Sequence, residues 1–219
     1  MRSISRTSVH WLCIMAILLD ILLLVLFVAV VASLYTEGMW GNAIMLINVL
    51  IAGVLATSYF EPLANRLESM SDSLATYTYL LDFLCLWVIF AVSLIVLRLL
   101  TDKLCRVKVR FLKLADQIGS VIFACMVAMA MVCFTTFTLH TAPLAKEFMF
   151  GGFKSNEGKV LAWSPDRWWL RFAWSASKNA YCWPTPKPFD HHGDFVGKYE
   201  SRRQEIEQHV DKTGALRKK

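Results

Sequence analysis

Four long runs of apolar residues, separated by polar or charged segments, set the pattern of this 219-residue chain. They cover residues 11–34, 42–60, 80–97 and 118–139, and each contains 18 to 24 residues. At about 1.5 Å per residue, helices of this length match the roughly 30 Å hydrocarbon core of a bilayer. The pattern therefore predicts an all-α, polytopic membrane protein with four transmembrane helices.

The composition agrees with this class. Hydrophobic residues make up 56% of the chain and the mean hydropathy is +0.47, which is too apolar for an ordinary soluble domain. In a membrane protein the net charge of +6 bears on orientation and on anionic lipid, so we do not expect nucleic acid as a partner. The first run follows two arginines, as in a secretory signal peptide, but its length and its internal Asp20 favour a retained helix.

The runs divide the chain into three parts: a polar N-terminal segment at 1–10, a transmembrane domain at 11–143 and an extramembrane tail at 144–219. Within the domain, Glu61-Pro62 is expected to end the second helix, because a residue before proline avoids the helical conformation. The tail carries 14 basic and nine acidic residues and is expected to be partly disordered from about residue 193.

One stretch of the tail, SPDRWWLRFAW, predicts a short helix with Ser164 as its cap and Pro165 at its first position. Tryptophans are common where rings lie at the level of lipid headgroups. We therefore expect the tryptophans of this region to lie at a membrane interface: Trp163, Trp168, Trp169 and Trp174.

The segment 98–113, between the third and fourth runs, is strongly basic. Six basic residues stand against the single acid Asp102: Arg98, Lys103, Arg106, Lys108, Arg110 and Lys113. Apolar residues at steps of three and four predict a basic amphipathic helix on anionic headgroups, with a plain loop or a short strand as alternatives. Because basic residues favour the cytoplasmic side, we expect the N-terminus and the tail outside.

The fourth run has small residues at every fourth position: Ser120, Ala124 and Ala128. These positions share one helix face, and in lipid a face of small residues lets another backbone approach closely. We expect this face to pack against another helix, either in a second copy of the chain or in another membrane protein. Asp116, which precedes the run, is expected at the N-terminal end of its helix, where the helix dipole favours an acid.

Asp20, Asn48 and Ser93 are the polar residues that could form a site inside the membrane. An acid in hydrocarbon is costly, so it usually faces a partner, a cavity or the interface. For Asp20, a proton or substrate contact and a purely structural role at a hydrogen bond or helix start both remain open.

No pattern predicts catalysis, a metal site or a cofactor. His191, His192 and Asp194 stand close together, but no further ligand has the spacing of a metal site. The sequence contains no GxSxG, HExxH, P-loop or dinucleotide fingerprint. Most of the cysteines lie inside apolar runs and are interpreted as small core residues. We therefore do not expect an enzyme.

Three positions resemble the bacterial colicin V production proteins, a family of inner-membrane proteins with four spans. They are Asp20, Gly38 in a turn eighteen residues later, and Asp116 at the start of the fourth run. In that family an Asp-Arg pair is followed by glycines at +4, +8 and +12. Here Gln117 replaces the arginine, and small residues hold the glycine positions: Ser120, Ala124 and Ala128. The resemblance covers about residues 18–143.

This resemblance implies a protein of the bacterial inner membrane that supports toxin production or export, or envelope homeostasis. Our hypothesis is a non-enzymatic scaffold or assembly factor that oligomerises through the Ser120 face. The alternative is a transporter or channel subunit that uses Asp20 in the membrane, with Asn48 and Ser93 on the same path.

Overall fold

The computed structural model describes residues 6–70, 78–105, 113–142 and 165–179, together with residues 195, 198, 199 and 201. The elements in this part of the chain are α1 (Arg6–Leu34), α2 (Gly38–Met70), α4 (Thr78–Leu104), α5 (Lys113–Thr141) and α6 (Pro165–Asn179). The described residues contain no strand, so the all-α class is confirmed for them.

Three of these helices contain segments long and apolar enough to cross a membrane: Gly38–Met70, Leu80–Leu104 and Lys113–Leu139. In α1 the side chains are described from Leu19 onward, and Leu19–Leu34 is apolar but shorter. The helix itself nevertheless continues without a break from Arg6 to Leu34.

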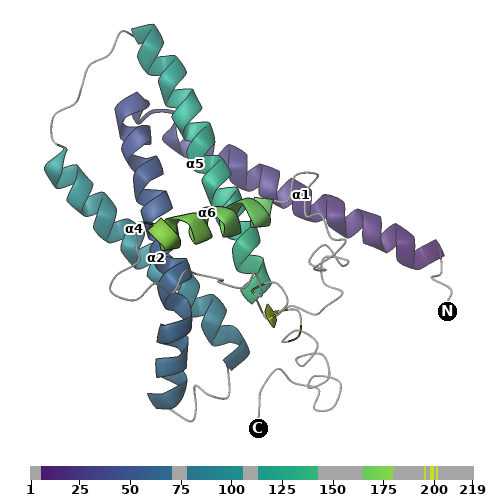
Figure 1. Ribbon diagram of the computed structural model, residues 1–219. Coiled ribbons are helices and arrows are strands. Elements are labelled where there is room, and N and C mark those ends of the chain that lie inside the picture. The colour runs from purple at the N-terminus through teal and green to yellow at the C-terminus, as the bar shows by residue number, and fades with distance from the viewer. Residues whose placement is uncertain are drawn as a thin grey trace.

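Helix α2 lies at the centre of the arrangement, with α4 along one side and α5 along the other (Figure 1). Helix α1 packs against α5 and diverges from the other helices toward its N-terminus, while α6 lies across α2 and α5. Helices α4 and α5 make few contacts with each other. The main core therefore lies along α2.

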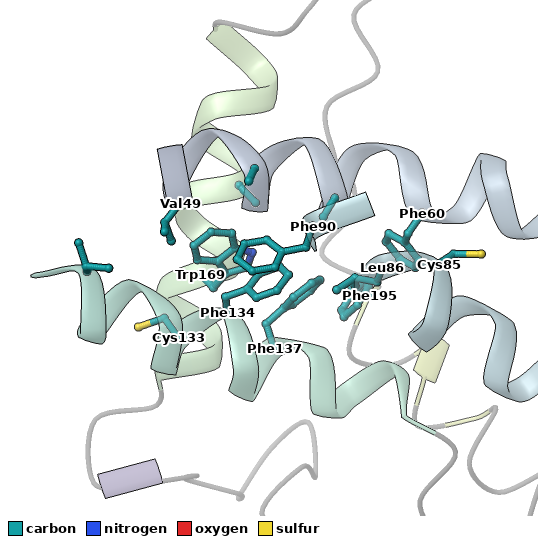
Figure 2. Close-up of a cluster of buried hydrophobic side chains, with 14 of the residues drawn as sticks. Val49, Phe60, Cys85, Leu86, Phe90, Cys133, Phe134, Phe137, Trp169 and Phe195 are labelled. Atoms are coloured by element: carbon teal, nitrogen blue, oxygen red, sulfur yellow. The ribbon is translucent and has the colours of Figure 1, made fainter. Parts of the chain in front are cut away.

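The core is centred on aromatic rings from three helices (Figure 2). Phe134 of α5 stacks on Phe90 of α4 at 4.3 Å between ring centroids, and Trp169 of α6 meets Phe134 edge-on at 5.2 Å. Lipid tails are as apolar as these side chains, so ring geometry and close packing, more than removal from water, hold such helices together.

Pro62 lies inside α2, which continues eight residues further to Met70. The prediction that this helix ends at Glu61-Pro62 is therefore wrong. Proline removes one helical hydrogen bond, but the turns beyond it gain contacts in the core. Three residues of these turns pack there: Leu63, Ala64 and Leu67. Tertiary packing thus outweighs the local preference of the residue before proline.

Residues 98–104 form the last two turns of α4 and not a separate surface helix. The predicted amphipathic helix over 98–113 is therefore wrong for this half, and residues 106–112, with Arg106, Lys108 and Arg110, lie outside the described residues. Leu97 still packs against the core, whereas Leu100 and Leu104 are exposed. The apolar third run simply carries its helix onward into the basic segment.

The predicted helix of the tail is confirmed as α6, which begins at Pro165. The interface position expected for all its tryptophans is wrong for Trp169, which is buried in the core, whereas Trp168 is 65% exposed. The edge of the Trp169 indole occupies the space where Gly53 of α2 lacks a side chain. Trp163 lies outside the described residues.

Two residues after position 193 also pack against the transmembrane helices. Phe195 stacks on Phe137 with 4.9 Å between ring centroids, and the Tyr199 hydroxyl donates a 3.0 Å hydrogen bond to Oδ2 of Asp82. Both side chains are buried, because their aromatic rings find contacts on α4 and α5. The expectation that the tail is partly disordered from about residue 193 stays a prediction. Most of the remaining residues of 180–219 lie outside the described part.

Candidate functional site

A pocket of about 610 Å³ opens where α1 and α4 end and where α2 and α5 begin. One part of its lining is apolar and comes from α1 and α2: Leu34, Trp40, Ile44 and Met45. The other part is charged and comes from the helix ends and the α1–α2 turn: Glu37, Arg98, Asp102, Lys113 and Asp116. The pocket therefore lies where the apolar helices meet their charged flanks.

Asp116 joins two helix N-termini at this pocket. It lies in the first turn of α5, as predicted, and its Oδ1 also accepts a 3.0 Å hydrogen bond from the backbone N–H of Met39 in α2. The first N–H groups of a helix have no partner within the helix, and an acid beside them also meets the positive end of the dipole. One carboxylate therefore stabilises the starts of both helices.

Gly38 brings the chain to this carboxylate. Its φ of +79° is in the left-handed region, where a side chain is strained, and a Cβ on it would lie 3.5 Å from Oδ2 of Asp116. The structure therefore brings together two positions that the sequence linked to one family, although they are far apart in the chain.

Asn42 connects three segments one turn further into the membrane domain. Its Nδ2 is 3.0 Å from three acceptors: the carbonyl oxygens of Leu34 and Ser120 and the hydroxyl oxygen of Ser120. Asn42 is fully buried, and Ser120 is 3% exposed. The buried amide therefore joins α5 to the last carbonyl of α1, which also accepts a hydrogen bond from the backbone N–H of Glu37.

The small-residue face of α5 is buried within the chain. Ala124 and Ala128 have no exposed surface, and Ser120 bonds to Asn42 of α2. The packing expectation therefore describes a contact inside one chain. This burial argues against an oligomer interface at the same face, and oligomerisation itself stays a prediction.

Arg98 and Glu37 form an ion pair in the pocket, with 3.0 Å between Nη2 and Oε1. Both side chains are nearly half exposed, and such pairs contribute about 0–1 kcal/mol. Lys113 also lines the pocket, whereas Lys103 is exposed on α4 outside it. The basic residues of 98–113 that the structure describes are therefore divided between the pocket and the outer surface.

Asn48 and Thr101 meet in the pocket lining, with a 3.0 Å hydrogen bond from Nδ2 of Asn48 to the Thr101 hydroxyl. Asn48 is 2% exposed, so this polar pair joins α2 to α4 in a buried place. Asn48 therefore does lie at a cavity, but at the end of the helices.

Asp20 and Ser93 do not join Asn48 in this pocket. Asp20 is exposed on α1, between Leu19 and Leu23, which pack against Val132 of α5. It has no hydrogen bond or ion pair with the residues that the structure describes, and Ser93 is partly buried on α4. The structure does not bring the three predicted polar residues onto one path.

No group of three potential metal ligands occurs among the described side chains. His191, His192 and Asp194 lie outside them.

Sequence reasoning missed Asn42, Glu37 and the contact between Gly53 and Trp169. Asn42 carried a usable signal, since it is an amide at the start of an uncharged run and one turn after the glycine of the turn. Its partners carried none, because a bond to backbone carbonyls 8 and 78 residues away leaves no local pattern.

Three long apolar helices packed along a common core, with charged residues gathered at their ends, define a polytopic α-helical membrane protein. A family model described as "Colicin V production protein" matches residues 19–163, about two thirds of the chain. The chain belongs to the colicin V production protein family. The matched region contains Asp20, Gly38 and Asp116 and ends just before α6. Searches of curated proteins and of solved structures gave no match.

Proposed function

We propose that this chain spans the bacterial inner membrane four times, with α1 as the additional span. Support comes from its 29 helical residues and from its packing on α5 through Leu19 and Leu23. The basic residues Arg98, Lys103 and Lys113 all lie at one end of α4 and α5, which favours that end on the cytoplasmic side. The N-terminus and the tail are then periplasmic.

The proposed role is that of a non-enzymatic scaffold or assembly factor that supports colicin V production or export, or envelope homeostasis. One observation carries this proposal: Asp116 and Gly38, both positions of the family pattern, meet at the start of α2. Beside Gly38, the Asp116 carboxylate accepts the backbone hydrogen bond of Met39 and so fixes the start of α2, which is a structural and not a catalytic setting. A fixed frame of helix ends suits the binding of other membrane proteins.

Because the Ser120 face is covered within the chain, we place the binding of partner proteins on other surfaces. The exposed apolar side of α4, for example at Val88, Val92 and Ile95, is available to lipid or to a neighbouring helix. The basic residues outside the pocket remain available to anionic headgroups.

The test is complementation in a strain that produces colicin V and lacks the gene for this protein, with secreted toxin as the readout. Wild type and Asp20→Asn are expected to restore secretion, whereas Asp116→Ala is expected to fail at equal membrane abundance. Gln117→Ala, at the exposed neighbouring position, is the matched control. A transporter that uses Asp20 gives the opposite order, so loss of secretion with Asp20→Asn but not with Asp116→Ala would contradict the scaffold.

A further inference from the structure

We propose that the pocket at the helix ends binds the phosphoethanolamine headgroup of an aminophospholipid. Four features of the lining lead to this ligand: charges of both signs, an open aromatic ring, a buried amide with a free acceptor, and an apolar wall that faces the membrane domain.

Charges of both signs line the same cavity. Arg98 and Lys113 supply two cationic groups, and three carboxylates stand with them: Glu37, Asp102 and Asp116. A purely anionic headgroup would face the carboxylates, and a purely cationic group would face the two bases. A headgroup with a phosphate and an ammonium pairs with both kinds of residue, and arginine–phosphate hydrogen bonds are among the strong ones.

The Arg98–Glu37 ion pair can open to admit the headgroup. The two side chains are 3.0 Å apart and about half exposed, so little free energy opposes their separation. Once they separate, Arg98 can bind the phosphate and Glu37 the ammonium. Both ions keep an opposite charge, and no carboxylate or guanidinium is left without a partner.

Trp40 and Asn48 favour the binding of the ammonium group of the headgroup. Trp40 lines the pocket and is 41% exposed, so its ring is open to a cation. Asn48 is 2% exposed and donates through Nδ2 to Thr101, while no described residue donates to its Oδ1. A primary ammonium can donate a hydrogen bond to that oxygen, whereas the quaternary ammonium of choline cannot.

The acyl chains have an apolar surface to follow from the pocket. Leu34, Ile44 and Met45 line it, and Leu99 and Leu100 are exposed on the adjoining turns of α4. Because α2, α4 and α5 are apolar enough to cross a membrane, this surface continues into the hydrocarbon. A headgroup in the pocket thus leaves its acyl chains where lipid already lies.

The experiment is native mass spectrometry of the full-length protein in detergent, titrated with phosphatidylethanolamine, phosphatidylcholine and phosphatidylglycerol of identical acyl chains. Phosphatidylethanolamine is expected to bind about tenfold more tightly than either of the others, the effect of one or two charge-assisted hydrogen bonds. Free phosphoethanolamine is expected to bind more weakly than the lipid. Equal binding of the free headgroup would overturn the lipid assignment.

Two exposed pocket residues provide the variants, Arg98→Gln and Asp102→Asn, and Lys103→Gln on the same helix but outside the pocket is the control. Both pocket variants are expected to lower affinity for phosphatidylethanolamine about tenfold while the control stays within about twofold. Equal affinities for the ethanolamine and choline lipids, or equal effects of Arg98→Gln and Lys103→Gln, would overturn the proposal. Lipid binding is measured on the purified protein, so its result is independent of toxin secretion.

Discussion

Oδ1 of Asp116 accepts a 3.0 Å hydrogen bond from the backbone N–H of Met39, 77 residues earlier in the chain. The N-terminus of α2 is therefore capped by a side chain of α5 and not by a residue of its own sequence. This bond makes the start of one membrane helix depend on the position of another.

Asp116→Ala is expected to lower the free energy of unfolding by about 1 kcal/mol, the usual cost of losing an N-cap. In a chain of this size that corresponds to a fall in Tm of about 2–4 °C, measurable by thermal unfolding in detergent micelles. Gln117→Ala should leave Tm unchanged, because Gln117 is exposed at the next position. Equal Tm values for the two variants would show that the bond to Met39 does not stabilise the protein.

Asn42→Ala is expected to cost more, about 1–3 kcal/mol, because it removes the buried hydrogen bonds from Nδ2 to the carbonyl oxygens of Leu34 and Ser120 and to the Ser120 hydroxyl. Asn65→Ala on the same helix provides the comparison, since Asn65 is exposed. Denaturant unfolding followed by circular dichroism measures both. A cost for Asn42→Ala no larger than that for Asn65→Ala contradicts the role assigned to the buried amide.

Gly53→Ala is expected to displace Trp169, because a Cβ at position 53 would overlap the indole ring. Overpacking of this kind costs about 1–3 kcal/mol. The loosened α6 should be cleaved faster by trypsin at Arg167 and Arg171, and adding Trp169→Leu should remove the extra effect of the alanine. Gly41→Ala is the control, since its Cβ would meet only ordinary contacts. Unchanged cleavage in Gly53→Ala would refute the close fit.

Ala124→Leu and Ala128→Leu are expected to destabilise the single chain, each by about 1–3 kcal/mol, because both alanines are fully covered. The size of the protein–detergent complex should not depend on them before unfolding. Met126→Leu, at a position 47% exposed, is the matched control. A smaller complex with an unchanged unfolding midpoint would restore the oligomer interface that burial argues against.

The apolar runs were enough to predict helices α1, α2, α4 and α5, since hydrocarbon requires continuous helical segments. Runs did not predict where helices end: α2 passes through Pro62 because residues beyond it find core contacts, which no local preference contains. The sequence also singled out Gly38 and Asp116, but not that they touch. Such contacts depend on which helices pack together. In lipid this packing depends on the fit of many side chains along two helix surfaces at once.

The predicted interface position of Trp169 was wrong for a related reason. Aromatic residues beside arginines are typical of a membrane interface, and Trp168 at the preceding position is indeed exposed. Trp169 instead fits against Gly53, 116 residues earlier, and against Phe134. The composition of one segment does not show where a glycine on another helix leaves space for a side chain.

The fit of Trp169 against Gly53 has a consequence for the way a ribosome makes this protein. At about 5–20 residues per second, Gly53 is added to the chain roughly 6–23 s before Trp169. During that interval the newly inserted helices lack the ring that fills the space beside Phe134. Helix α6, the last described helix to be translated, thus completes the core beside Gly53 of α2. A nascent chain arrested before α6 would remain in the membrane without this part of the core.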